Sequence, residues 1–375
     1  MKLSSLDVSS LRNIKLSKFE PLGDVNIFSG PNGSGKSSVL EALHILGAGK
    51  SFRSSTIRPV IMRGKKNCTV FGALTDQEGR SVSIGVKKNI TGRHQIRING
   101  VDQKSSSILA KSLPLQIISS SSYGLLEGGP RQRRQFLDWG VFHVEQSFYE
   151  DWKKFQRVLK QRNICLRENR SQPHMLEVWD TKLAELSIKL NHSRESYFKN
   201  LIPFFEKFKS HLLDLPGIEL EFFCGWDEDQ TIEEMTLKNK ARDLAHGITH
   251  AGPHRADLKV NINGISAGQL LSRGQQKLVI YALKLAQCQL LNTNKGMRCI
   301  LLIDDLPAEV DVIHQKRLCN ILNNLNVQLF LTSICPLGLS SQDWSLKNSV
   351  VIFNLLNGEI NKISRPKIGP ASFSN

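Results

Sequence analysis

Several features that define other classes of protein are missing from this chain of 375 residues. No apolar run approaches the ~20 residues that a membrane-spanning helix needs, and the run Cys299 to Ile303, beside a motif discussed below, has only five. The first residues, Met1 to Ser5, contain no apolar core of the kind found in secretory signals. The seven cysteines are an odd number without a Cys-x-x-Cys pair, which argues against a disulfide framework or a thiolate zinc site. We therefore expect a cytoplasmic protein with reduced thiols and no membrane segment.

Acidic residues are scarce relative to basic ones. The chain has 34 Asp and Glu against 50 Lys and Arg, which gives a net charge of +16. Such an excess points to a polyanionic partner, whether nucleic acid, an acidic membrane surface or an acidic protein. A basic surface without a partner is the remaining interpretation. The other proportions, 40% hydrophobic and 22% charged residues, are typical of a globular protein, and the length predicts two domains or one elaborated domain.

More than half of the excess charge lies in one stretch, residues 50–97. It contains eleven Lys and Arg but only two acids, Asp76 and Glu78, so its net charge is +9. Alternating runs predict three short strands within it, at residues 69–74, 81–86 and 95–98. We hypothesise that this stretch contacts the phosphates of duplex DNA, because few aromatic residues lie among the cations to stack on single-stranded bases. A second candidate surface consists of three cations on a predicted helix, Lys153, Arg157 and Lys160.

A glycine-rich motif follows a predicted strand at residues 25–29. Its pattern, Gly-x-x-x-x-Gly-Lys-Ser, is typical of P-loops, whose backbone N–H groups surround a phosphate at the start of a helix. Apolar residues at helical spacing predict that helix, with Gly47 and Gly49 at its end. The alternative is a fortuitous glycine-rich turn. In a P-loop, Lys36 reaches the β- and γ-phosphates and Ser37 coordinates Mg²⁺. The residues assigned to nucleotide binding here are Gly30, Pro31, Asn32, Gly33, Ser34, Gly35, Lys36, Ser37 and Ser38.

Two acids follow an apolar run further along the chain. Residues 299–303 predict a buried strand, and Asp304 and Asp305 come directly after it. Ligands bind at the carboxyl ends of strands in open α/β folds. We therefore assign Asp304 to the Mg²⁺ shell with Ser37. Asp305 and Lys36 are assigned to catalysis, with Asp305 orienting or polarising the attacking water. A strand that ends in two aspartates is weak evidence alone and gains weight beside a P-loop.

Another predicted helix begins at a motif suited to a phosphate. Residues 271–275 read Leu-Ser-Arg-Gly-Gln, in which Ser272 is a good N-cap and Gly274 permits close approach of the backbone. A helix N-terminus directed at an anion is electrostatically favourable. An ordinary N-cap without a ligand is the alternative. We assign Ser272, Gly274 and Gln275 to nucleotide binding.

The middle of the chain is predicted to be helical. Aromatic and aliphatic residues recur at helical spacing over residues 148–159 and again over 176–197, with a polar loop containing Pro173 between them. We expect Pro203 to limit the second helix. The pattern fits a short antiparallel hairpin with a coiled-coil-like seam, and it fits an ordinary face of a helical bundle equally well.

Together these motifs resemble the P-loop, signature, Walker B strand and D-loop of ABC-type ATPases, the last represented by Asp311. Within that class the sequence resembles the RecF family of bacterial recombination and repair ATPases. Segments spread in order along almost the whole chain carry this resemblance: residues 11–13, 49–53, 128–130, 133–138, 160–163, 252–258 and 309–311.

The resemblance implies an α/β fold, namely an ABC-type P-loop ATPase head like that of SMC proteins. Such a head has an antiparallel β-rich subdomain and an inserted helical lobe with a short helical hairpin and the signature motif. It implies an ATPase lobe over residues 1–122 and 296–375 and a helical lobe over residues 123–295. It also implies that two heads sandwich two ATP molecules, so that Ser272 acts on the partner's nucleotide, and that Asp311 contributes to nucleotide binding.

The sequence departs from related ATPases at several positions. Arg273 stands where transporter ATPases have glycine, and the second Walker B acid is Asp305 and not glutamate; both features are shared with RecF-like heads. The family usually has Pro-Glu where residues 119–122 are all serine. Gln116 is a candidate for the Q-loop glutamine. No switch histidine follows the predicted strand 327–331, where Thr332 and Ser333 stand instead.

The leading hypothesis is an ATP-dependent DNA-binding protein of recombinational repair and replication-fork maintenance. ATP would drive dimerisation of the heads, the homodimer would clamp duplex DNA near single-strand gaps, and slow, weakly DNA-stimulated hydrolysis would release it. Single-stranded DNA would bind less tightly than duplex DNA. The resemblance adds RecO and RecR as partners and RecA loading as the outcome. Two alternatives are a nucleotide-binding subunit of an ABC transporter and a DNA scaffold that binds ATP with negligible turnover.

Overall fold

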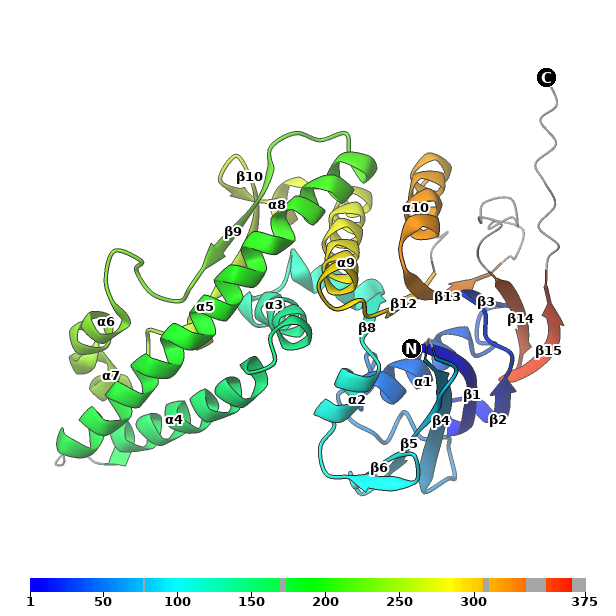
Figure 1. The fold of residues 1–375 in the computed structure, drawn as a ribbon, viewed down its shortest axis with the longest axis horizontal. Helices are drawn as coiled ribbons and strands as arrows, with labels where there is room; N and C mark the ends of the chain where they lie inside the picture. Colours follow the sequence, from blue (N-terminus) through cyan, green and yellow to red (C-terminus); the bar gives the residue numbers. More distant parts are fainter. Residues whose placement is uncertain (77, 169–172, 306–309, 335–348, 366–375) are drawn as a thin grey trace. The chain divides into compact units, whose positions relative to one another are not determined.

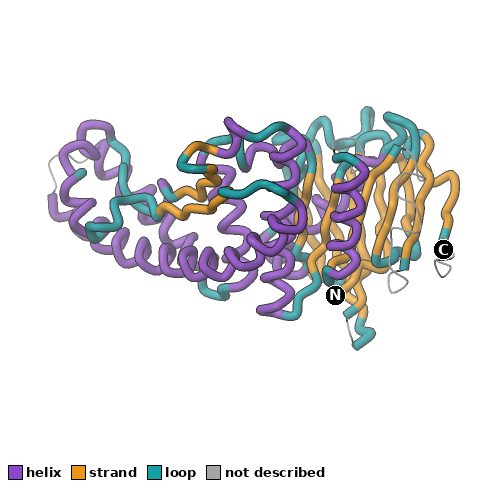
Figure 2. Tube along the Cα trace, turned by 90° about the horizontal axis from the view of Figure 1, so that it is seen from above, coloured by secondary structure: helices purple, strands orange, loops and turns teal. Residues whose placement is uncertain are grey.

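The computed structural model describes the chain except residue 77 and residues 169–172, 306–309, 335–348 and 366–375. The chain forms two compact units (Figure 1). Unit 1 comprises residues 1–122 and 277–375, and unit 2 comprises residues 123–276. Strands dominate unit 1 and helices dominate unit 2 (Figure 2).

The first sheet of unit 1 is antiparallel, with strand order β2-β1-β4-β5-β6-β7. Along β4 the buried residues alternate with partly exposed ones, because successive side chains of a strand point to opposite faces. The three strands predicted in the basic stretch are confirmed as β4, β5 and β6, each somewhat longer than expected. The strands are β1 (Lys2–Leu11), β2 (Ile14–Phe19), β4 (Asn67–Thr75), β5 (Ser81–Asn89), β6 (His94–Ile98) and β7 (Val101–Gln103).

The second sheet of unit 1 has the order β15-β14-β3-β13-β12-β8 and is parallel except for the edge strand β15. Every residue of β3, β12 and β13 is buried, as expected for parallel strands covered on both faces. The carboxyl ends of these three strands therefore lie at one edge of the sheet. The strands are β3 (Val25–Ser29), β8 (Leu115–Ile118), β12 (Cys299–Ile303), β13 (Val327–Ser333), β14 (Val350–Leu356) and β15 (Glu359–Ser364).

Helix α1 (Lys36–Ala48) contacts strands of both sheets and is buried almost all round. Its residues join those of the two sheets in a single hydrophobic core, which is typical of a helix enclosed on every side. The helix ends as predicted at Gly49, which has φ 68° and donates its N–H to the carbonyl of Ile45, whereas Gly47 lies inside the helix. Two further helices belong to unit 1, α2 (Ser107–Ser112) and α10 (Val312–Asn324).

The boundary between the units falls inside a helix, α9 (Arg273–Lys295). The sequence-based boundary lay at the other end of this helix, after residue 295. Residues 277–295 belong with unit 1 instead, because their buried side contacts the second sheet: Gln116 of β8 donates to Gln287 at 2.7 Å and accepts from Lys284 at 2.7 Å. Only the first turn of α9, with the signature motif, belongs with unit 2.

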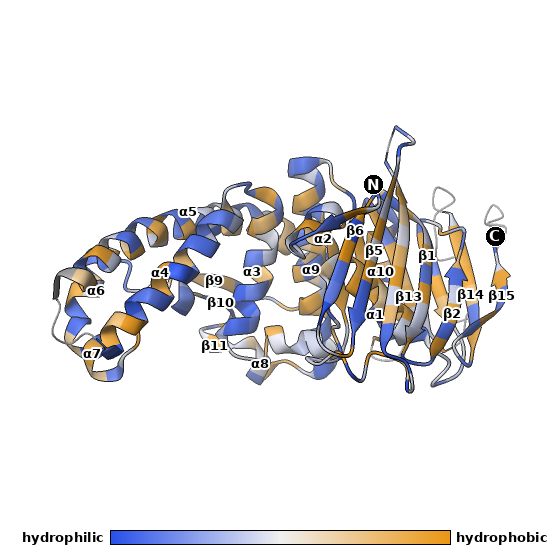
Figure 3. Ribbon diagram, turned by 90° about the horizontal axis from the view of Figure 1, so that it is seen from below, coloured by the Kyte–Doolittle hydropathy of each residue, from blue (hydrophilic) through white to orange (hydrophobic). Residues whose placement is uncertain are grey.

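Two long helices form the predicted hairpin in unit 2, α4 (Phe148–Glu168) and α5 (Pro173–Leu212). Both show hydrophobic and hydrophilic patches along their length (Figure 3), as expected for helices buried on one side. The prediction that Pro203 limits the second helix was wrong, because α5 continues through it to Leu212. Pro203 is exposed, so the carbonyl that loses its helical partner can bond to water. Pro173 is likewise the first residue of α5 and not part of a loop, a position that proline favours.

A small sheet and several short elements complete unit 2. The sheet has the order β11-β10-β9 and is antiparallel, with the predicted turn at Asn263 and Gly264. Arg133 joins helix α3 to this sheet through a two-point ion pair with Asp257 (2.7 and 2.8 Å). The elements are η1 (Ser120–Leu125, at the boundary of the units), α3 (Pro130–Val144), β9 (Ile218–Phe223), α6 (Ile232–Lys238), α7 (Lys240–His246), η2 (Pro253–Arg255), β10 (Asp257–Ile262), β11 (Ile265–Ser266) and α8 (Ala267–Leu270).

Candidate functional site

The P-loop connects the end of β3 to the start of α1. Gly30 and Gly35 have φ values of 151° and 108°, which side-chain-bearing residues rarely adopt. A Cβ atom on Gly30 would also lie 2.3 Å from the carbonyl oxygen of Leu355. The loop leads directly into the N-terminus of α1, where unpaired backbone N–H groups and the helix dipole favour an anion.

Side chains from outside and inside the motif hold the P-loop in place. Asn13, in the turn between β1 and β2, donates to the carbonyl of Gly33 at 2.9 Å and accepts from the hydroxyl of Ser38 at 3.0 Å. Lys36 donates to the carbonyls of Gly30 (2.7 Å) and Pro31 (3.0 Å), so its ammonium lies over the loop. Burial lowers the pKa of Lys36, and the nearby carboxylates of Asp305 and Asp304 partly oppose this.

The two acids that follow β12 lie beside the P-loop, as predicted. The hydroxyl of Ser37 donates to Oδ1 of Asp304 at 2.9 Å, which links the start of α1 to the end of β12. A hydroxyl and a carboxylate are ligands that suit Mg²⁺, which usually keeps several waters and bridges to substrate phosphates. The described residues contain no cluster of three or more His, Cys, Asp or Glu side chains that could hold a metal on its own.

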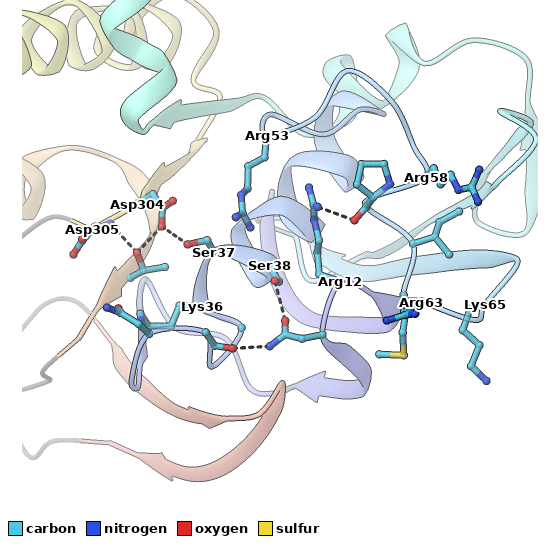
Figure 4. Close-up of a pocket in the computed structure, with 18 of the residues that line it drawn as sticks. Arg12, Lys36, Ser37, Ser38, Arg53, Arg58, Arg63, Lys65, Asp304 and Asp305 are labelled. Atoms are coloured by element: carbon cyan, nitrogen blue, oxygen red, sulfur yellow. Dashed lines mark hydrogen bonds between the residues drawn. The ribbon is translucent and has the colours of Figure 1, made fainter.

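A pocket of about 830 Å³ surrounds these residues in unit 1. Figure 4 shows Lys36, Asp304 and Asp305 at one end, with Arg58, Arg63 and Lys65 at the other. Arg12, Arg53 and Ser38 lie between the two ends. Apolar side chains contribute further to the lining, namely Pro59, Ile61, Met62, Ile90 and Ile334. A pocket that combines a P-loop with basic and apolar side chains has the character of a nucleotide site.

The arginines of the pocket were not assigned to it from the sequence. Arg12 makes two bonds of 2.8 Å to the carboxylate of Glu41, a residue of α1 whose side chain is fully buried. Arg53 lies 3.8 Å from the same carboxylate. The signal that could have revealed these arginines is Glu41 itself, because an acid in the mostly apolar part of this helix requires a buried partner.

The basic stretch at residues 50–97 does not form one uniform surface. Four of its eleven cations line the pocket, namely Arg53, Arg58, Arg63 and Lys65. Arg80 pairs with Asp76 and Glu78, and Arg97 pairs with Asp102. Three exposed cations have no acidic partner among the described residues and lie at one end of strands β4, β5 and β6. We call them the basic edge: Lys66, Lys87 and Arg93.

The signature motif forms the start of α9 in unit 2. Ser272 accepts from the backbone N–H of Gln275 at 3.4 Å, and the Gln275 side chain accepts from the backbone N–H of Ser272 at 3.0 Å. This reciprocal pair is a capping box, so the motif is a well-formed helix N-terminus. Arg273 pairs with Glu127 at 2.7 Å and lies over the ring of Tyr123 at 5.1 Å. Gly274 is partly exposed, and a Cβ atom there would meet no neighbour.

Two positions named from the sequence, Asp311 and Gln116, do not line the pocket. Asp311 is the N-cap of α10 and accepts from the backbone N–H of His314 at 3.0 Å. Gln116 is buried and bonds to α9, which does not support a Q-loop role facing the nucleotide. Thr332, by contrast, lines the pocket and bonds to both Walker B residues.

Comparisons with known proteins agree with this architecture. A family model described as the RecF/RecN/SMC N-terminal domain matches residues 2–346. The DNA replication and repair protein RecF of Pseudomonas fluorescens is 42% identical over 360 residues, which is 96% of this chain and 98% of the relative. The protein of the same name from Azotobacter vinelandii is 43% identical over 360 residues, with the same two coverages.

The solved structures that are similar in fold include a protein of the same name as these relatives. A structure described as the recombination mediator protein RecF with ATP, in the RecFOR pathway, matches with a TM-score of 0.82, 26% identity and 98% coverage of both chains. An Smc head bound to the C-terminal winged-helix domain of ScpA matches with a TM-score of 0.60 and 14% identity over 99% of both chains, which shows the fold alone. The predicted ABC-type, SMC-like head is thus confirmed. Within the described part of the chain, no helix combines the length and apolar character needed to cross a membrane.

Proposed function

The chain belongs to the RecF family of DNA replication and repair proteins, and we propose that it is an ATP-dependent DNA clamp that acts as a recombination mediator. Family membership removes the transporter subunit from consideration. The observation that carries the proposal is the 2.9 Å bond between Ser37 of the P-loop and Asp304. It joins a phosphate-binding helix N-terminus to a strand-end carboxylate in one pocket.

We assign each of these pocket residues a separate role in ATP binding and hydrolysis. Lys36 and the N-terminus of α1 would bind the β- and γ-phosphates. Ser37 and Asp304 would hold Mg²⁺, which supplies neutralisation of the phosphate charge when bound. Asp305 would orient the attacking water. The apolar lining of the pocket, including Ile61 and Met62, would contact the base.

Nucleotide binding is tested by the affinity for a fluorescent ATP analogue. Lys36→Ala is expected to weaken binding at least tenfold, because it removes the cation that neutralises the terminal phosphates. Lys189→Ala is the matched control, since Lys189 is an exposed lysine of α5 in unit 2. Equal affinities of the two variants would contradict the assignment of the pocket.

We propose further that the signature motif acts in trans, across a homodimer formed with ATP. Gel filtration with ATP, ADP or no nucleotide, with and without a DNA duplex, measures the dimer directly.

A mixture of Lys36→Ala and Ser272→Arg chains would contain one intact composite site per mixed dimer, so part of the ATPase activity should return. Mixed dimers without any recovery would count against shared sites. The same ATPase assay, with and without DNA, separates a hydrolysing clamp from a scaffold with negligible turnover.

For DNA, the basic edge is the surface that we favour. Its three cations are exposed and carry no acidic partner among the described residues. Replacing Lys66, Lys87 and Arg93 with Gln is expected to weaken duplex binding and make the salt dependence shallower by about 2 to 3 in log K against log salt. The predicted helical surface, Arg157 and Lys160 with Lys153, is the alternative. Replacing those three with Gln should leave the slope unchanged, and the reverse result would move the interface to α4.

Partners follow from the family and not from the geometry. The relatives are DNA replication and repair proteins, and one solved relative is described as part of the RecFOR pathway. We therefore propose RecO and RecR as partners, with RecA loading at single-strand gaps as the outcome. Co-purification with RecR in the presence and absence of ATP tests the first of these interactions.

A further inference from the structure

A threonine near the end of β13 connects the two halves of the nucleotide site. Thr332 lies on the strand between β3, which leads into the P-loop, and β12, which leads into the two acids. It pairs in register with Phe28 of β3, and the residue before it, Leu331, pairs with Ile303 of β12. Its side chain is 1% exposed. This is the region of the chain where the sequence offers no switch histidine.

The Thr332 hydroxyl bonds to both Walker B residues. It accepts from the backbone N–H of Asp305 at 2.7 Å and donates to Oδ1 of Asp304 at 2.8 Å. A hydroxyl has one proton, and an N–H can only donate, so these two roles are fixed. The backbone N–H of Asp304 bonds to the carbonyl of Ile118 on the opposite neighbour, β8. The Thr332 side chain thus supplies the bond that the sheet no longer provides for Asp305.

The backbone at Asp305 has an unusual conformation. Its φ is 58°, in the left-handed region that aspartate visits more readily than most residues but that still requires support from its surroundings. The bond from its N–H to Thr332 supplies such support. Without that bond the chain at Asp305 could relax, and the direction of the Asp305 carboxylate would change with it.

The carboxylate of Asp304 is fixed by two hydroxyl groups on the same oxygen. Ser37 and Thr332 both donate to Oδ1, at 2.9 and 2.8 Å. Both bonds are to this one oxygen, and Oδ2 makes no hydrogen bond to the described residues. The Ser37 hydroxyl also keeps lone pairs for a metal while its proton is directed to Asp304.

We propose that Thr332 is a positioning residue that holds Asp304 for Mg²⁺ and Asp305 for water activation, in place of a switch histidine. The inference rests on the proposed nucleotide site. Thr332 acts through the two aspartates and need not touch the nucleotide. Groups that orient metal ligands in this way commonly change metal affinity or activity by 10- to 100-fold when removed.

The test compares three variants at this position. Thr332→Val replaces the hydroxyl with a methyl group, Thr332→Ala removes it without adding bulk against Asp304, and Thr332→Ser keeps it. Thr69→Val is the matched control, because Thr69 is a strand residue of the first sheet that does not line the pocket. The first measurement titrates Mg²⁺ into each protein with a fluorescent ADP analogue and records the midpoint. The second measures kcat and KM for ATP.

We expect Val and Ala to raise the Mg²⁺ midpoint about 10- to 100-fold and to lower kcat by a similar factor, with KM for ATP changed less than about threefold. Ser and the Thr69→Val control should stay within about threefold of the parent in every measurement. An unchanged midpoint and kcat in Val and Ala would overturn the proposal. Equal loss in Ser would also overturn it, because the methyl group and not the hydroxyl would then be responsible.

Failure of the proposed function can be told apart from failure of this inference. If the parent protein binds ADP more tightly with Mg²⁺ but does not hydrolyse ATP, the ATPase proposal fails. The Mg²⁺ midpoints still decide the role of Thr332 in that case. If the parent shows no effect of Mg²⁺ on nucleotide binding, the inference about Thr332 is overturned as well.

Discussion

Glu41 of α1 is buried and pairs with Arg12, which lines the nucleotide pocket. We therefore expect Glu41→Gln to reduce both the stability of the fold and the affinity for nucleotide. The carboxylate is fully buried and accepts two bonds of 2.8 Å from Arg12, while Ser51 donates to the same group. Glutamine keeps the shape of the side chain. It loses the negative charge and presents an NH₂ donor where the guanidinium of Arg12 also donates.

The magnitude follows from the burial of the pair. Removing one member of a fully buried ion pair costs about 3–5 kcal/mol, because the other charge remains without a partner. The Arg12 side chain is 22% exposed, so water can recover part of this cost. We therefore expect about 2–3 kcal/mol of lost stability. For a unit of this size, that corresponds to a fall in Tm of about 4–12 °C.

The assay combines thermal unfolding with binding of the fluorescent ATP analogue. Arg12 and Arg53 line the pocket and both face Glu41, so Glu41→Gln should also weaken nucleotide binding, by about tenfold if the loosened arginines cost 1.4 kcal/mol. Glu185→Gln, on an exposed position of α5, is the control and should change neither quantity. A Glu41→Gln protein with Tm within about 1 °C of the parent and unaltered affinity would refute the reasoning.

Three further predictions concern pH, the helical hairpin and Asp305. Burial lowers the pKa of three histidines to about 4, namely His44, His143 and His254. In the unfolded chain these histidines are protonated near pH 6.5, so between pH 6.5 and 4 the unfolded state binds more protons than the folded state. The free energy of unfolding should therefore be highest above pH 6.5 and fall as the pH is lowered from 6.5 to 4. Urea titrations at pH 7.5 and 5 measure the fall, which His143→Phe should reduce. Arg162 is fully buried against Asp243, so Arg162→Ala should lower the free energy of unfolding by about 3–5 kcal/mol, and an unchanged urea midpoint would contradict this. Asp305→Asn should bind ATP and accumulate as a dimer in gel filtration, whereas ATP-bound monomer would argue against Asp305 as the carboxylate that activates water for hydrolysis.

The parts of the site that could be predicted are those encoded by local patterns. The P-loop and the strand that ends at Asp304 each occupy a few consecutive residues whose spacing dictates a strand, a loop and a helix. Parallel strands align their carboxyl ends, so the proximity of Ser37 and Asp304 followed from the predicted topology. The bond between them agrees with that expectation.

The parts that could not be predicted depend on distant segments. Arg12 lies in the pocket because the end of β1 pairs with residues 60 and 61. No local sequence pattern indicates this pairing. The division of the basic stretch into a pocket wall and a basic edge depends on which way each loop turns. Pro203 was misinterpreted for a similar reason: burial of Leu201 and Phe205 on either side favours the helix by more than the lost backbone bond costs.

The order of strands in the second sheet of unit 1 also affects how the chain folds as it is synthesised. β3, which leads into the P-loop, has β13 and β14 as its neighbours, so neither neighbour exists until residue 327 has been made. Unit 2 is continuous, from residue 123 to 276, and can fold before the neighbours of β3 have been synthesised. Pairings so distant in sequence are slow to form. The nucleotide site is therefore expected to be the last part of the molecule to mature, and a chain that terminates before β13 would expose an unpaired apolar strand to aggregation.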